Sequence, residues 1–213
     1  EGLHAAIAIE MVERGDWNGA AELQARPGPF NQTMAITHFA RALGAARAGR
    51  APQAGQAMAR LEELAKGMTD PRQQYFARQA GLQLEAVRGW VAFAEGRPDE
   101  AERLLRAAAD ADDALGKHPV SPGSLLPARE MLADLLLERG KAREALAEYE
   151  GCLKLNPGRL NSLYGAGSAA ERAGDREVAR RHYEALAAMV AKDAIRPEVA
   201  KARAFLADAG RPA

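Results

Sequence analysis

The sequence predicts an all-α protein built from stacked helical hairpins, and two regularities carry this prediction. Five glycines recur along the chain, each followed five residues later by an alanine: Gly15, Gly49, Gly96, Gly140 and Gly174. The first and last intervals between them are 34 residues, and the two between are 47 and 44. A period of this size is typical of arrays of helix pairs. The sustained period-2 alternation of a half-buried strand does not occur.

The composition agrees with closely packed helices and excludes two classes of partner. Of the 213 residues, 49 are alanine and only 5% are aromatic, and alanine is the best helix former. The 29 basic residues balance the 29 acidic residues, whereas nucleic-acid binding normally needs a basic excess. No apolar run approaches the ~20 residues that a membrane-spanning helix needs. We therefore expect no nucleic acid and no membrane span.

Glycine and proline signals divide the first half of the chain into three expected hairpins, about 3–26, 31–66 and 71–116. In the first, Pro27 and Pro29 cut the second helix short. The third opens with Asp70 as an N-cap and Pro71 in the first turn, where a proline is well tolerated.

The second half is expected to hold hairpins over about 124–156 and 160–192 and a capping helix over about 196–209. In the first of these, Ser124 would cap the helix and Pro127 would lie in its first turn. The final helix should bury one apolar stripe and expose its other side, as an end repeat requires. The stripe consists of Ile195, Val199, Ala202 and Leu206.

Residues 126–159 and 160–193 resemble two consecutive tetratricopeptide repeats. The first has Ala145, Tyr149 and Pro157 at the spacing A-x3-aromatic-x7-P, and the second has Gly167, Ala179 and Tyr183 at the matching places. The resemblance implies a right-handed α-α superhelix, a solenoid of this type, as a single domain over 1–213 with a C-terminal capping helix.

Two further points qualify the resemblance. The family's tryptophan at the fourth repeat position is replaced by Arg129 and Leu163. The stretches 119–130 and 156–165 also resemble an uncharacterised group of bacterial repeat proteins, which implies the C-terminal portion of a longer protein. No secretory signal is recognisable. The single Cys152 fits a reducing compartment or a cysteine-poor exported protein, so the compartment stays open.

The resemblance also implies a ligand groove, because the first helix of each tetratricopeptide hairpin lines the concave side. An acidic and hydrogen-bonding lining of this kind would suit a cationic or polar peptide. The alternative is that these are ordinary exposed helix residues, since like charges four residues apart cost little. The groove residues are Glu130, Asp134, Glu138, Asn161, Tyr164, Ser168 and Glu171, with Arg129 and Arg159 close by.

The corresponding upstream positions are apolar: Ile36, Phe39, Leu43, Trp90 and Phe93. We expect these side chains to be buried, because large apolar residues at helical spacing usually belong to a core. Contact with a partner is the alternative. The first helix is too apolar to end an array, so we expect a preceding portion of the protein or another subunit to cover it.

No catalytic or metal-binding constellation is recognisable. The four histidines, His4, His38, His118 and His182, lack the paired spacing of metal ligands. Cys152 is expected to be a buried packing residue, because no base is positioned beside it.

The leading hypothesis is therefore a non-enzymatic scaffold that binds a protein or peptide and needs no cofactor or metal. One alternative is a structural segment that forms oligomers through its apolar N-terminal end. Another is the accessory domain of an enzyme whose catalytic part lies upstream.

Overall fold

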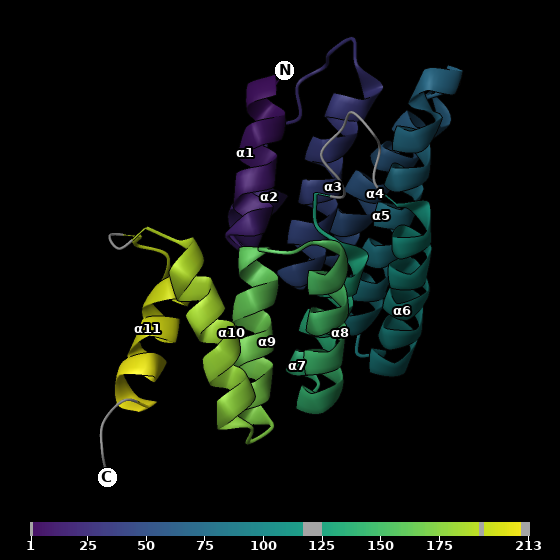
Figure 1. The fold of residues 1–213 in the computed structure, drawn as a ribbon. Coiled ribbons are helices and arrows are strands. Elements are labelled where there is room, and N and C mark those ends of the chain that lie inside the picture. Colours follow the sequence, from purple (N-terminus) through teal and green to yellow (C-terminus); the bar gives the residue numbers. More distant parts are fainter. Residues whose placement is uncertain (1, 117–124, 192–193, 210–213) are drawn as a thin grey trace. The chain divides into compact units, whose positions relative to one another are not determined.

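The computed structural model describes residues 2–116, 125–191 and 194–209 (Figure 1). Within these ranges the chain forms eleven α-helices and one 3-10 helix, packed in adjacent pairs, without strands. The all-α prediction is confirmed. The chain divides into two compact units, residues 1–128 and 129–213, each of which is described by itself. The single solenoid expected over 1–213 stays a prediction.

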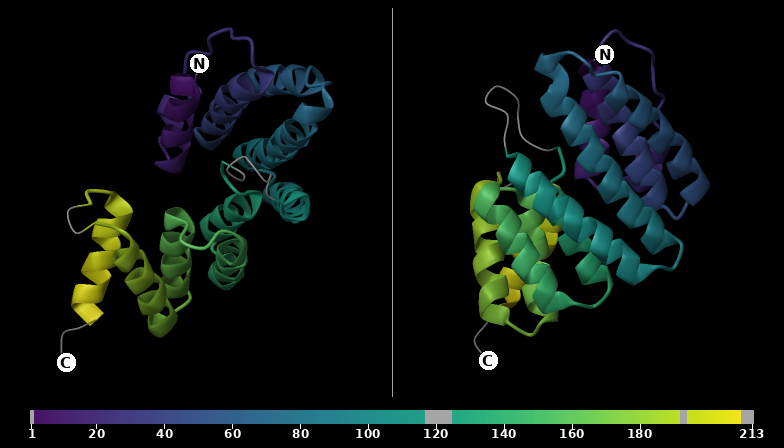
Figure 2. Two further views of the ribbon diagram at one scale, coloured as in Figure 1. Left: turned by 45° about the horizontal axis from the view of Figure 1, so that its top comes forward. Right: turned by 90° about the vertical axis from the view of Figure 1, so that its right-hand side faces the viewer.

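Unit 1 contains six α-helices in the order α1 (Gly2–Glu13), α2 (Trp17–Ala21), α3 (Asn31–Arg47), α4 (Ala51–Lys66), α5 (Gln74–Ala94) and α6 (Pro98–Leu115), with a 3-10 turn at Pro71–Gln73 before α5. Helix α3 is central, because it packs against α1, α2, α4 and α5. Figure 2 shows the α3–α4 and α5–α6 pairs from two further directions. The pairs α3–α4 and α5–α6 lie where the hairpins 31–66 and 71–116 were expected. The second helix of the first pair ends at Ala21 rather than near residue 26.

Unit 2 contains α7 (Ala128–Glu138), α8 (Ala142–Leu155), α9 (Leu160–Arg172), α10 (Arg176–Met189) and α11 (Pro197–Ala209). Helix α7 begins later than the expected residue 124, and Pro127 precedes the helix instead of lying in its first turn. Ser124, the expected cap, lies outside the described residues. The hairpin expected over 160–192 is present, with its second helix ending at Met189.

The five recurring glycines end helices in one common geometry. Each has a positive φ, between 66° and 82°, a conformation that glycine adopts without steric cost. In each case the next residue donates its N–H to the carbonyl five residues earlier at 2.8–2.9 Å, as in Arg50 to Ala45, which is the hydrogen bond of a Schellman motif. The alanine five residues after each glycine is completely buried, at 0% exposure. The predicted turns are therefore confirmed.

Small residues let aromatic rings pack against helix backbones in unit 2. A Cβ atom added to Gly165 would lie 2.4 Å from the ring of Tyr149, and one added to Gly167 would lie 2.4 Å from the ring of Tyr183. Both rings are buried. These positions therefore require glycine because the rings occupy the space of a side chain.

The final helix agrees only in part with the expected stripe. Val199 and Ala202 are fully buried, and Leu206 packs against the same cluster as Tyr183. Ile195 is 93% exposed and precedes the helix, which begins at Pro197. Its assignment to the stripe was wrong, because helical periodicity does not extend beyond the first helical residue.

Candidate functional site

The residues that the sequence analysis placed in a groove are largely engaged with one another in unit 2. Glu130 on α7 is only 1% exposed. Its carboxylate accepts two hydrogen bonds from the Arg159 guanidinium, at 2.7 and 2.9 Å, and a further one from the Ser162 hydroxyl. Such a bidentate pair is geometrically specific. Glu130 therefore faces the interior of the unit, where Arg159 and Ser162 offset the cost of burying its charge.

Two tyrosine hydroxyls tie the second helix of a pair to an acidic residue on its first helix. Tyr149 on α8 donates to Asp134 on α7 at 2.5 Å, and Tyr183 on α10 donates to Glu171 on α9 at 3.2 Å. Burial is the main cause that raises the pKa of Tyr183 above its ordinary value. The Tyr183 hydroxyl therefore remains a protonated donor at neutral pH.

The other predicted groove residues differ in exposure and contacts. Arg129 pairs with Glu148 at 2.5 Å, and Asn161 accepts a hydrogen bond from Arg196 at 3.1 Å. Tyr164 and Ser168 are half-buried, and the Tyr164 ring lies 6.1 Å from that of Tyr183. Along α7, the carboxylate line passes from the buried Glu130 through the half-buried Asp134 to the exposed Glu138. The assignment of these residues to a ligand groove stays a prediction.

Cys152 is buried beside this polar network, as expected. Its Sγ lies 3.4 Å from the Ser162 hydroxyl. Burial raises the pKa of the thiol to about 11, with the Ser162 hydrogen bond acting in the opposite direction. Because the thiolate is the reactive form, this environment suits a packing residue and not a nucleophile.

A hollow of about 160 Å³ lies in unit 1 between α1, α3 and α5. Its walls combine apolar side chains with three glutamines and hold no charged side chain. Cavities of about 150 Å³ accept a benzene-sized molecule, so this one has room for a single apolar side chain. The hollow is lined by Ile9, Gln32, Ala35, Ile36, Met68, Phe76, Gln79, Ala80, Gln83 and Leu125.

The glutamines give this hollow a neutral hydrogen-bonding character. Gln83 on α5 is buried, and Gln32 accepts a hydrogen bond from Gln73 at 3.3 Å. The Nε2 atom of Gln79 is buried and has no hydrogen-bond partner among the described residues. An unpaired buried donor is costly, so its presence beside a hollow is typical of a place where a ligand or water binds.

Sequence reasoning found only part of this hollow. Ile36 was among the predicted upstream positions, whereas the glutamines were not singled out. A signal was present, because Phe76, Ala80 and Gln83 recur at i, i+4 and i+7 and so lie on one helix face. The amide groups escaped notice because a glutamine in a helix is usually solvated.

The remaining upstream apolar residues are mostly core, as expected. Phe39, Leu43 and Trp90 are buried, and Phe93 is half-buried. The guanidinium of Arg47 stacks on Trp90, with its central carbon 3.8 Å from the ring centroid. This cation–π contact joins α3 to α5.

Among the described residues, no group of three His, Cys, Asp or Glu side chains is placed to hold a metal ion. None of the described helices combines the length and the apolar character needed to cross a bilayer. No family model, no curated protein and no solved structure matches the chain. The function must therefore be argued from the residues and their geometry.

Proposed function

We propose that this chain is a non-enzymatic binding module, a tetratricopeptide-like array that holds a peptide or protein segment on the face formed by α1, α3 and α5. These are the first helices of three successive pairs, and the resemblance assigns first helices to the ligand side. The observation that carries the proposal is the 160 Å³ hollow on this face. Pockets of this kind, apolar with a few polar groups, are typical binding sites.

The repeated turn geometry supports the array. Five helices end in a left-handed glycine with the same hydrogen bond, and each is followed by a buried alanine. Recurrence of one helix-pair unit is what a solenoid requires.

The lining defines the chemistry of the bound segment. The lining side chains Met68, Phe76 and Ile36 offer apolar contact, and the glutamine amides offer hydrogen bonds without charge. The segment that fits best places one apolar side chain in the hollow and pairs its backbone amides with Gln79 and Gln83. Such anchoring by one buried side chain is typical of interaction hot spots.

The test is a peptide selection against the whole chain. Peptides are selected from a random displayed library with the wild-type protein as bait, and the affinity of the selected peptides is measured by calorimetry. Ala80→Leu fills the hollow from its buried wall and is expected to weaken binding at least tenfold, about 1.4 kcal/mol.

Ala77→Leu is the matched control, because Ala77 lies on the same helix, is half-buried and does not line the hollow. It should bind like the wild type. Equal affinity of the Ala77→Leu and Ala80→Leu proteins, both shown to be folded by circular dichroism, would contradict the proposed site. The predicted groove in unit 2 is tested separately with Tyr164→Ala. This substitution should weaken the binding of only those ligands that contact α9.

A second candidate function is self-association through the N-terminal helix. Leu3 is 70% exposed and Ile7 is 38% exposed on α1, and exposed apolar side chains in one region are typical of interaction surfaces. Multi-angle light scattering of wild type and Leu3→Glu/Ile7→Glu distinguishes this candidate. A wild-type protein that is monomeric at every concentration excludes it.

A further inference from the structure

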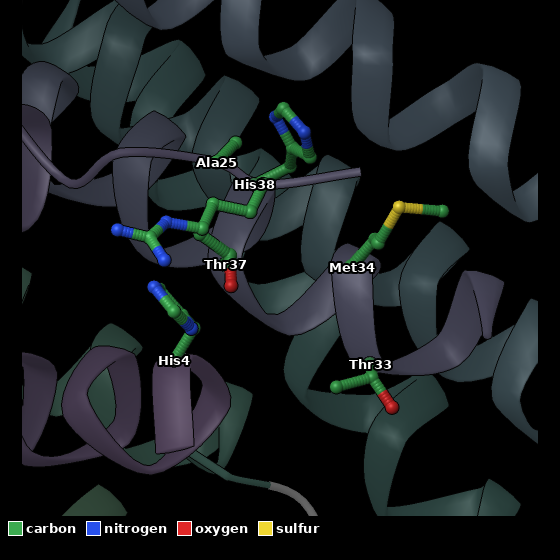
Figure 3. A pocket seen from close by; sticks show the side chains of 7 residues that line it. His4, Ala25, Thr33, Met34, Thr37 and His38 are labelled. Carbon is green, nitrogen blue, oxygen red and sulfur yellow. The ribbon is translucent and has the colours of Figure 1, made fainter. Parts of the chain in front are cut away.

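A second, smaller hollow in unit 1 does not belong to the face proposed above. It has a volume of about 20 Å³ and lies where α1 and the segment between α2 and α3 meet α3 (Figure 3). Its lining contains five hydrogen-bonding side chains, from histidine, arginine and threonine, and no carboxylate. The lining residues are His4, Ala25, Arg26, Thr33, Met34, Thr37 and His38.

Its polar side chains come from three separate elements. His4 lies on α1, Arg26 on the connecting segment and Thr37 on α3. In Figure 3 the His4 ring extends toward the side of α3 that carries the Thr37 hydroxyl. Arginine has five donors and no acceptor, and no ion pair of Arg26 is found in the described part of the chain. What the lining lacks is an anionic acceptor.

Two buried polar side chains strengthen this reading. Thr37 is 5% exposed and His38 is 9% exposed. The Nδ1 atom of His38 is buried without a hydrogen-bond partner in the described ranges. Native proteins rarely leave such atoms unpaired unless a water, an ion or a ligand completes the site.

The charges around the hollow favour an anion. Arg26 lines it directly, and the positive charge of Arg41 acts on the buried His38 ring. Arg60 acts on the same ring, but its charge is offset by an ion pair with Glu63 at 2.6 Å. Arginine's planar fork matches the oxygens of phosphate and carboxylate groups.

We propose that this hollow binds the phosphoryl group of a phosphate monoester. Donors on three elements match the three terminal oxygens of such a group, whereas a carboxylate has only two. Arg26 supplies the charge-assisted bonds, and His4 and Thr37 supply one donor each. The small volume admits the phosphoryl oxygens at the mouth and leaves the rest of the ligand outside. This inference is independent of the hollow between α1, α3 and α5.

The test is a titration of the intact chain with inorganic phosphate at constant ionic strength. Binding is monitored by the NMR signals of the His4 ring and the Thr37 amide. Saturable shifts of both signals are expected. Arg26→Gln should weaken binding at least tenfold, and Arg26→Lys should weaken it less because it keeps the charge. Arg78→Gln removes one exposed charge from α5 outside the hollow and should bind phosphate like the wild type.

Two comparison ligands complete the test. Phosphorylethanolamine should bind as well as inorganic phosphate if the site takes esters, whereas binding of inorganic phosphate alone would overturn the assignment to a monoester. Acetate and chloride at matched ionic strength should shift neither signal saturably. Equal saturation by acetate, equal binding by Arg26→Gln and the wild type, or no saturable shift at all would overturn the proposal.

Discussion

The two units differ in how they treat buried polar groups. In unit 2 the buried Glu130 carboxylate is paired with Arg159, and the hydroxyls of Tyr149 and Tyr183 are paired with acidic side chains. In unit 1 several buried polar atoms have no hydrogen-bond partner within the described residues. They are His38 Nδ1, Arg41 Nε, Gln79 Nε2 and Trp90 Nε1.

This difference indicates that the polar groups have different roles. A fully paired network fixes the geometry of the helices that carry it. Unpaired buried groups lower stability unless something binds them. Two of the four, His38 and Gln79, line the two hollows described above. The comparison therefore supports our proposal of ligand binding in unit 1, whereas the polar layer of unit 2 is paired within itself.

The largest expected effect follows from breaking the buried ion pair of unit 2. Glu130→Ala leaves the Arg159 guanidinium without its main partner and should lower the free energy of unfolding by about 3–5 kcal/mol. The measurement is unfolding in urea, monitored by the rate at which Cys152 is alkylated. Cys152 is the chain's single thiol and lies in unit 2, so its alkylation reports on that unit.

The control for this prediction is Glu177→Ala, which breaks the exposed pair with Arg180 and should change stability far less than Glu130→Ala, because solvent screens an exposed pair. Both tryptophans, Trp17 and Trp90, lie in unit 1, so tryptophan fluorescence reports on that unit. A Glu130→Ala loss no larger than that of Glu177→Ala would break the comparison between the units.

The second effect is a pH dependence of unit 1. Burial, followed by the charge of Arg41, lowers the pKa of His38 from 6.5 to about 4 in the folded state. The unfolded state therefore binds the proton first as pH falls, and stability is lost between about pH 6.5 and pH 4, by at most about 3 kcal/mol. This loss is measured by unfolding the protein in urea at several pH values and monitoring the tryptophan fluorescence.

The reference protein for the pH series is His38→Gln, which cannot titrate at this position. Its unfolding free energy should fall less between pH 6.5 and pH 4 than that of the wild type. Parallel curves for the two proteins would show that the unpaired histidine does not carry the acid sensitivity of unit 1.

The third effect concerns glycines that differ in their surroundings. Gly167→Ala would place a Cβ 2.4 Å from the Tyr183 ring and should cost about 1–3 kcal/mol. Gly55→Ala on α4 of unit 1 meets no atom within 4 Å and should stabilise by about 0.5–1 kcal/mol. The stability of both variants is measured by thermal unfolding. Stabilisation by Gly167→Ala would contradict the packing described for unit 2.

The smallest effect is the slow reaction of the Cys152 thiol. A pKa of about 11 lowers its thiolate fraction, and this loss outweighs the higher nucleophilicity of a more basic thiolate. Alkylation at pH 8 should be at least about tenfold slower in the native protein than in 6 M guanidinium chloride. Equal rates would show that the polar layer of unit 2 opens readily.

Particular residues show how much of the structure could be predicted from the sequence. The helix pairs around Gly49, Gly96 and Gly174 were predictable, because a left-handed glycine and a buried alanine are local requirements. The burial of Cys152 and Trp90 was predictable from residue type. Residue type alone could not reveal that Glu130 is buried, because its partners lie 29 and 32 positions away.

The sequence by itself determined the helical class, the positions of the turns and the alanine contacts, since each depends on residues within one helix pair. Only the tertiary structure decided which polar side chains are paired, where the hollows lie and that α11 excludes Ile195 from its stripe. The physical reason is that pairing and cavities depend on how side chains from several helices share space. That sharing is governed by packing between distant segments and leaves no periodic signal in the chain.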